Sequence, residues 1–69
     1  MTKIKIFING EQVEINQNIT LYNLISYLEL DVKKIAIEKD SEIINSIDFE
    51  KIILTENCKV EIVHFIGGG

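Results

Sequence analysis

Two short segments of alternating apolar and polar residues, separated by Asn9-Gly10, constrain the fold of this chain most strongly. In KIKIFI at 3–8, apolar side chains occupy every second position, which is typical of a half-buried β-strand. QVEI at 12–15 repeats this alternation. Asn-Gly favours a tight hairpin turn because both residues tolerate a positive φ. The sequence therefore predicts a β-hairpin whose core-facing residues are Ile4, Ile6, Ile8, Val13 and Ile15.

One short helix is predicted at about 21–29. Leu21, Leu24, Ile25 and Leu28 recur at intervals of three and four residues, so they form one apolar stripe along a helix. Thr20 is well suited to cap the helix, because its hydroxyl can accept a hydrogen bond from a free N–H of the first turn. A helix of this length is not stable alone in water, so we expect it to pack on the sheet.

The second half of the chain predicts three further strands. They are KIAIE at 34–38, a short strand at Ile43-Ile44, and KVEIVHFI at 59–66. The connector SIDFEKI at 46–52 predicts a helical turn held by Ile47 and Phe49. We thus expect one domain at 1–66 with the order β-β-α-β-β-β, followed by a flexible glycine tail at 67–69.

Composition limits how such a small domain can be stabilised and what it can bind. The 69 residues include one cysteine and one histidine, so neither an internal disulfide nor a Cys/His zinc site can form, and no metal site is predicted. The apolar fraction of 46% must supply the core. The net charge of −4 argues against nucleic-acid binding and is compatible with basic protein partners. No apolar run is long enough to span a membrane, and we expect a cytoplasmic monomer.

The predicted order of elements and the small size indicate an α+β fold. It would be a mixed five-stranded sheet with one main helix packed on one face, which is the ubiquitin-like β-grasp arrangement. In that arrangement the first strand lies beside the last strand. The parallel pairing of these two strands follows from the fold analogy and not from the sequence pattern.

Catalytic residues are not predicted, and we expect that the protein is not an enzyme. Cys58 precedes His64 by six residues, but a Cys–His pair also needs an orienting group and a pocket. We expect Cys58 to be an ordinary thiol in a surface turn or half-buried. We expect His64 to cap the edge of the core or to point to a partner. The acidic residues are scattered without the spacing of a metal loop or a paired-acid site.

Three glycines, Gly67, Gly68 and Gly69, are the last residues of the sequence. A phosphate-binding glycine loop is not expected, because such a loop precedes a helix. Without a Cβ, Gly67 and Gly68 could pass through a narrow channel and present the Gly69 carboxylate to another enzyme. A carboxylate becomes a good electrophile only after activation, for example as an acyl-adenylate made from ATP. The pattern indicates a carrier, and the alternatives are an inert terminus or a linker remnant.

Alternation in the last strand also predicts a docking surface. If Val60 and Ile62 face the core, Val63 and Phe65 face away from the helix, and Phe7 points the same way from the neighbouring strand. We expect Phe7, Val63 and Phe65 to form an exposed apolar patch just before the tail. Such patches usually mark partner sites. The alternatives are that a loop covers these residues or that a small protein simply leaves them exposed.

Four segments of the chain are typical of one family: KIFINGEQVEI, ITLYNLISYL, IAIEKDSEII and KVEIVHFIGGG. Through these segments the whole chain resembles the thiamine-biosynthesis sulfur carrier (ThiS) family. The chain departs from the family pattern at four places. Asp40-Ser41 replaces Asn-Gly, Asn45-Ser46 replaces Pro-Arg, Phe49 replaces a tryptophan, and Asn57-Cys58 replaces Gly-Asp. These departures leave open a sister carrier of the same fold.

The resemblance implies a role and a set of partners. An E1-like (ThiF-like) adenylyltransferase would use ATP to adenylate Gly69. Sulfur from a persulfide donor, such as a cysteine desulfurase, would then displace AMP and leave a thiocarboxylate, which a thiazole synthase (ThiG-like) would accept. The carrier itself would hold no cofactor. Alternatives are the small subunit of molybdopterin synthase, a carrier for tRNA thiolation or cysteine synthesis, a ubiquitin-like modifier joined to lysines, and a β-grasp binding module with an inert tail.

Overall fold

The computed structural model describes residues 2–65 of the chain. The predicted domain boundary after residue 66 and the glycine tail at 67–69 lie outside these residues. The elements, in chain order, are β1 (Lys3–Ile8), β2 (Glu11–Asn16), α1 (Leu21–Tyr27), the 3₁₀ helix η1 (Val32–Lys34), β3 (Ile35–Lys39), β4 (Glu42–Ile44), the 3₁₀ helix η2 (Ser46–Lys51) and β5 (Lys59–His64).

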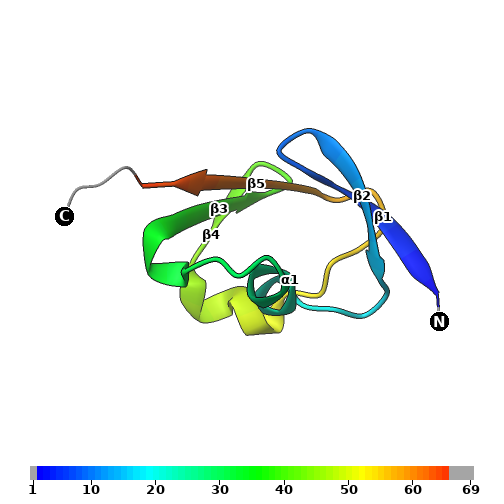
Figure 1. The fold of residues 1–69 in the computed structure, drawn as a ribbon, viewed down its shortest axis with the longest axis horizontal. Helices are drawn as coiled ribbons and strands as arrows, with labels where there is room; N and C mark the ends of the chain where they lie inside the picture. The colour runs from blue at the N-terminus through cyan, green and yellow to red at the C-terminus, as the bar shows by residue number, and fades with distance from the viewer. Residues whose placement is uncertain (1, 66–69) are drawn as a thin grey trace.

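Within residues 2–65, five strands form one mixed sheet in the order β2-β1-β5-β3-β4 (Figure 1). β5 is the central strand, antiparallel to β3 and parallel to β1. The parallel contact is short, because only Phe7 and Ile8 of β1 pair with β5. The predicted fold class, element order and neighbouring first and last strands are all confirmed.

The predicted hairpin is also confirmed, with Asn9 and Gly10 as a two-residue turn between Ile8 and Glu11. Their φ values of 50° and 83° place both residues in the left-handed region, as a type I′ turn requires. All six residues of β1 pair with β2 without a bulge. This register puts the predicted core-facing residues of the two strands opposite one another, Ile4 with Ile15 and Ile6 with Val13.

Helix α1 begins as predicted and ends two residues early. The Thr20 hydroxyl accepts from the N–H of Asn23, and the Asn23 side chain accepts from the N–H of Thr20, which forms a capping box. At the other end Glu29 has a φ of 58°, and the N–H of Leu30 donates to the carbonyl of Ile25. This is a Schellman motif, and it stops the helix before Leu28, which stays 38% exposed instead of completing the apolar stripe.

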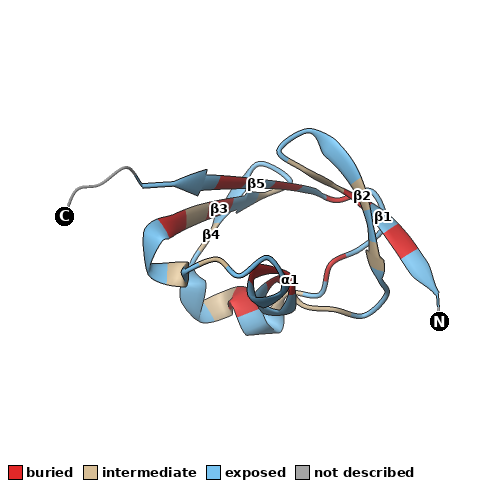
Figure 2. Ribbon diagram, in the orientation of Figure 1, coloured by how far each residue is buried: buried red, intermediate tan, exposed pale blue. Residues whose placement is uncertain are grey.

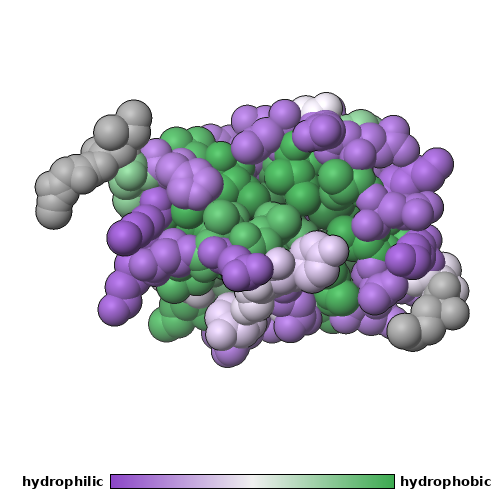
Figure 3. Space-filling model, viewed as in Figure 1, coloured by the Kyte–Doolittle hydropathy of each residue, from purple (hydrophilic) through white to green (hydrophobic). Residues whose placement is uncertain are grey.

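The core lies between α1 and one face of the sheet, with η2 and the segment before β5 closing it (Figure 2). Leu21, Leu24 and Ile25 of the helix are buried against isoleucines of the strands. In the space-filling view, apolar residues gather in the middle of the face between β5 and α1, with hydrophilic residues around them (Figure 3). No helix in the described part of the chain is long and apolar enough to cross a membrane.

The connector η2 was predicted only in part. Phe49 is buried, as expected, but Ile47 is 77% exposed and does not hold the connector. Two residues that are two positions apart in a helix do not face the same side, so η2 can bury only one of them.

Candidate functional site

The segment that leads to the predicted tail is β5, and it is held on both sides for most of its length. On one side it pairs with β3 as far as His64 opposite Ile35, and the N–H of Phe65 donates to the carbonyl of Lys34 at 2.9 Å. On the other side the β1 ladder stops at Ile8. Gly67, Gly68 and Gly69, the predicted carrier residues, follow outside the described part of the chain.

Where β1 ends, the side chain of Asn9 makes the next hydrogen bonds to β5. Its Oδ1 accepts from the N–H of Ile62 at 2.7 Å, and its Nδ2 donates to the carbonyl of the same residue at 3.2 Å. The amide thus presents one donor and one acceptor to β5, as a peptide group of a further strand residue would. Sequence reasoning identified Asn9 only as a turn former, because nothing local shows that its side chain reaches a strand about fifty residues away.

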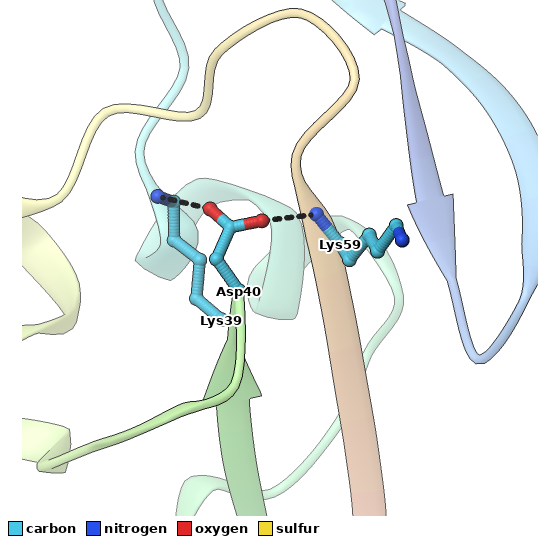
Figure 4. Close-up of polar contacts among 3 residues, drawn as sticks. All are labelled: Lys39, Asp40 and Lys59. Atoms are coloured by element: carbon cyan, nitrogen blue, oxygen red, sulfur yellow. Dashed lines mark hydrogen bonds and ion pairs between the residues drawn. The ribbon is translucent and has the colours of Figure 1, made fainter.

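Asp40, in the turn between β3 and β4, holds the start of β5. Its carboxylate accepts from the N–H of Lys59 at 2.9 Å and from the ammonium of Lys39 at 3.1 Å (Figure 4). The Lys59 N–H and then the Lys39 ammonium lower the pKa of Asp40, because both favour the charged carboxylate. Asn9 and Asp40 therefore fix β5 from opposite sides of the sheet centre.

The outward direction of Val63 and Phe65 agrees with the alternation read from the sequence. Val60 and Ile62 are buried, whereas Val63 and Phe65 are 59% and 60% exposed. The register places Ala36 of β3 directly opposite Val63, on the same face. Two exposed apolar side chains thus lie at the end of the described part of the chain, and Phe65 is its last residue.

Phe7 does not join this group. It pairs with Lys59 at the start of β5, four residues before Val63, and it is half-buried. At about 3.3 Å per strand residue, the two positions are about 13 Å apart along the strand. The predicted three-residue patch is therefore divided, because the register of β1 against β5 is set by tertiary packing and cannot be read from the alternation.

Beside Val63, two carboxylates lie opposite one another on the outer face of the sheet. Glu38 of β3 pairs with Glu61 of β5, and both side chains are exposed. In the part of the chain that the structure describes, neither has an ion pair with a lysine. Like charges directly opposite in a sheet repel one another, so a cation approaching this face would be attracted. Ile43 of β4, opposite Glu38, adds an apolar side chain that is 79% exposed.

Cys58 and His64 do not form a catalytic pair. Cys58 is buried, with 4% exposure, so the expectation of a surface or half-buried thiol is wrong. The turn before it is fastened to β1, because the N–H of Asn57 donates to the carbonyl of Lys5 at 2.6 Å, and this brings Cys58 into the core. His64 is exposed at the opposite end of β5. Among residues 2–65, no group of three or more potential metal ligands is found.

Within residues 2–65, the sheet order and the single α-helix over one face together define a ubiquitin-like β-grasp protein. The family model for the ThiS family matches residues 5–69, so the chain belongs to the ThiS family.

Individual relatives agree with this family. The chain is 32% identical over 63 residues to "Sulfur carrier protein ThiS" of Bacillus subtilis, covering 90% of this chain and 96% of that protein. It is 36% identical to "Uncharacterized protein ycf40" of Trieres chinensis over the full length of both chains. The crystal structure of a thiamine biosynthesis protein (ThiS) from Geobacter metallireducens superposes with a TM-score of 0.83 at 20% identity, covering 96% of this chain and 100% of that one, which supports the fold.

A second kind of relative is much longer than this chain. The chain is 35% identical over 66 residues to "Thiazole synthase" of Paramagnetospirillum magneticum. The alignment covers 96% of this chain but only 20% of that protein. That protein therefore combines a region similar to this chain with a much larger remainder.

Proposed function

We propose that this protein carries sulfur for the formation of the thiazole moiety of thiamine, with Gly69 as the residue that holds the sulfur. The observation that carries the proposal is the ThiS family match, which extends through all three glycines to residue 69. The sulfur-carrier name of the Bacillus subtilis relative supports it. In this role the protein is a substrate of its partner enzymes and not a catalyst.

The proposed chemistry proceeds through an activated carboxylate. An E1-like adenylyltransferase joins the Gly69 carboxylate to AMP from ATP and releases pyrophosphate. A persulfide from a cysteine desulfurase or a related donor displaces AMP and forms an acyl disulfide. A thiol then reduces the sulfur–sulfur bond, which leaves a thiocarboxylate on Gly69 and a disulfide on the donor side. Because this sequence needs ATP and reducing thiols, we place it in the cytoplasm.

Thiazole synthase is the proposed acceptor of the sulfur. Two proteins with that name, from Paramagnetospirillum magneticum and Magnetococcus marinus, each contain a region similar to this chain within one polypeptide. A carrier region joined to the rest of a synthase is consistent with two activities that act in succession.

The direct test is the intact mass of the protein after incubation with ATP, a persulfide donor and the activating enzyme. We expect the mass increase of one oxygen-to-sulfur exchange, located at Gly69 by fragmentation. A variant that lacks Gly68 and Gly69 should show no exchange. If the full chain stays unmodified, or instead becomes linked to lysines of other proteins, the proposed sulfur chemistry is wrong.

We further propose that Val63 and Phe65, with Ala36 opposite Val63, form the surface that docks on the activating enzyme. Replacing Phe65 with aspartate should lower kcat/KM for adenylation about tenfold, because an exposed anchor residue of this kind contributes about 1–2 kcal/mol to docking. Ile47→Asp is the control, since Ile47 is also an exposed apolar residue, at 77% against 60% for Phe65, but lies on η2. Equal rates for the two variants would contradict this docking surface.

A further inference from the structure

The two edges of the sheet differ in a way that the proposed carrier role does not use. β4 forms one edge and is three residues long, which leaves little backbone for another strand to pair with. β2 forms the other edge with six residues in unbroken register against β1. It contains no proline, lysine or bulge, and of the usual devices that protect an edge strand it has only the charges of Glu11 and Glu14. The β2 edge is therefore open to strand pairing.

The hairpin geometry shows which backbone groups of β2 face outwards. Ile8 and Glu11 flank the two-residue turn and form a hydrogen-bonded pair, and bonded and non-bonded pairs alternate along an antiparallel ladder. The N–H and C=O groups of Gln12, Glu14 and Asn16 therefore point away from β1. Among the described residues, no loop, turn or helix makes a backbone hydrogen bond with these three residues.

A groove with a mixed apolar and polar lining lies beside this edge, between β2 and α1. Ile15, Ile19 and Leu24 contribute apolar side chains to its lining, and Tyr27 borders it with 81% of its surface exposed. A strand added next to β2 would direct every second side chain to the same face as Ile15. Those side chains would enter the groove, so backbone pairing and apolar burial would occur together.

The charges at the edge indicate the kind of strand that fits. β2 carries Glu11 and Glu14 and no basic residue, whereas Lys3 lies at one end of the groove and Lys5 of β1 pairs with Glu14 on the inner side of β2. Opposite charges across neighbouring strands stabilise a sheet, so lysine or arginine would be favoured opposite Glu14. A second copy of this chain pairing through β2 would bring four glutamates together, in addition to two net charges of −4. Charge therefore favours a basic partner segment over self-association.

We propose that the β2 edge and its groove bind an extended segment of a partner protein, with alternating basic and apolar residues, by strand addition. The site is separated from β5 by β1, so it remains available while Val63 and Phe65 dock elsewhere. A partner could in this way retain the carrier between successive enzymes. The proposal does not depend on chemistry at Gly69.

The test is a titration of the full chain, followed by backbone amide NMR, with a capped seven-residue peptide of alternating lysine and valine. We expect saturable shift changes at residues 12–16, 19 and 23–27, and no comparable changes at β4. A peptide of alternating glutamate and valine should bind about threefold or more weakly, as expected from the loss of cross-strand charge pairs. The absence of saturable shifts, or shifts centred on the outer face of the sheet, would overturn the proposal.

Glu14→Pro is the decisive variant. Proline removes an outward N–H and places its ring at the edge, while the β1 ladder uses the groups of Val13 and Ile15. We expect Glu14→Pro to weaken binding of the lysine–valine peptide about tenfold or more, and Glu14→Gln, which keeps the N–H, to weaken it only about threefold.

A second variant keeps the proposal testable if Glu14→Pro does not fold. Tyr27→Ser removes an exposed ring from the border of the groove and should also reduce affinity. The site would be rejected if Tyr27→Ser binds the peptide as well as the wild type does and Glu14→Pro also binds it unchanged. If Glu14→Pro does not fold, unchanged binding in Tyr27→Ser alone would reject the site. Concentration-dependent shifts at β2 in the protein alone would assign the edge to self-association instead. None of these outcomes changes the mass test for sulfur at Gly69.

Discussion

The two hairpin turns, Asn9-Gly10 and Asp40-Ser41, share a backbone shape but hold β5 by different chemistry. All four residues have φ between 49° and 83°. In each turn the first residue donates its N–H to a β5 carbonyl, from Asn9 to Val60 and from Asp40 to Lys59. The side chain of that residue then adds a further contact to β5. The Asn9 amide is neutral and bonds to both an N–H and a C=O, whereas the Asp40 carboxylate can only accept.

This difference shows how a five-stranded sheet can hold a central strand whose neighbour is too short. β1 leaves β5 after Ile8, so the peptide groups around Ile62 would lack partners on that side. The Asn9 side chain supplies a partner for the N–H of Ile62 and another for its C=O. At the opposite turn β3 already pairs with β5 as far as Lys39. Asp40 extends this ladder by two contacts with Lys59, of which only one comes from its side chain. We therefore expect the Asn9 contact to matter more.

The largest expected effect is the loss of the Asn9 side chain. Asn9→Gly keeps a residue that tolerates the positive φ but removes both hydrogen bonds to Ile62. At about 1 kcal/mol for each bond, the free energy of unfolding should fall by about 1–2 kcal/mol, measured by urea denaturation.

Asn18→Gly is the matched control for this change. Asn18 has a φ of 66°, and within residues 2–65 its side chain makes no hydrogen bond, so the free energy of unfolding should change by no more than about 0.5 kcal/mol. If both variants lose the same stability, the contact of Asn9 with β5 is not what stabilises the sheet.

The elements that could be predicted from the sequence are those with local signals. The β1–β2 hairpin follows from alternation and Asn-Gly, and α1 follows from its apolar stripe and Thr20. The neighbouring first and last strands required the fold analogy. The early end of α1 could not be predicted, because Glu29 in a left-handed conformation replaces the glycine that would have marked it.

The candidate site was predictable only where it depends on alternation within one strand. The prediction that Val63 and Phe65 are exposed was correct for that reason. The separation of Phe7, the burial of Cys58 and the Asn9 contact depend on the register and packing of segments distant in sequence. The roles of Gly67, Gly68 and Gly69 rest on family membership, because they lie outside the described residues.

The next largest change in the free energy of unfolding is expected at the second residue of each turn, Ser41 and Gly10. Ser41 has a φ of 73°, which is strained for a residue with a side chain, while Gly10 occupies the corresponding place without strain. Ser41→Gly should therefore raise the free energy of unfolding by about 1 kcal/mol.

Gly10→Ser is the reciprocal change and should lower the free energy of unfolding by about the same amount. A Cβ at Gly10 would meet no atom within 4 Å, so this loss would report backbone strain and not a clash. Chemical denaturation of the two variants side by side tests the comparison. Changes of the same sign in both would show that the turns are not equivalent in backbone strain.

The smallest expected effect is a dependence of stability on pH, which the Asp40 contact should show and the Asn9 contact should not. The Lys59 N–H and the Lys39 ammonium lower the pKa of Asp40 below the usual value for an aspartate. Its contribution to stability is therefore fully present above the unfolded-state pKa and is lost as pH falls through the folded-state pKa. The side chain is 50% exposed, so water and salt screen the interaction and the change should be less than that of Ser41→Gly.

Thermal unfolding from neutral pH to below about pH 3 should show this loss in the wild type and a smaller one in Asp40→Asn, since an amide cannot titrate. Glu42→Gln is the control, because Glu42 makes no hydrogen bond or ion pair through its side chain in the described part of the chain. Asn9→Gly should lose the same stability at every pH, because the Asn9 amide carries no charge. If Asp40→Asn and Glu42→Gln have the same pH profile, the carboxylate of Asp40 holds β5 no better than a neutral acceptor would.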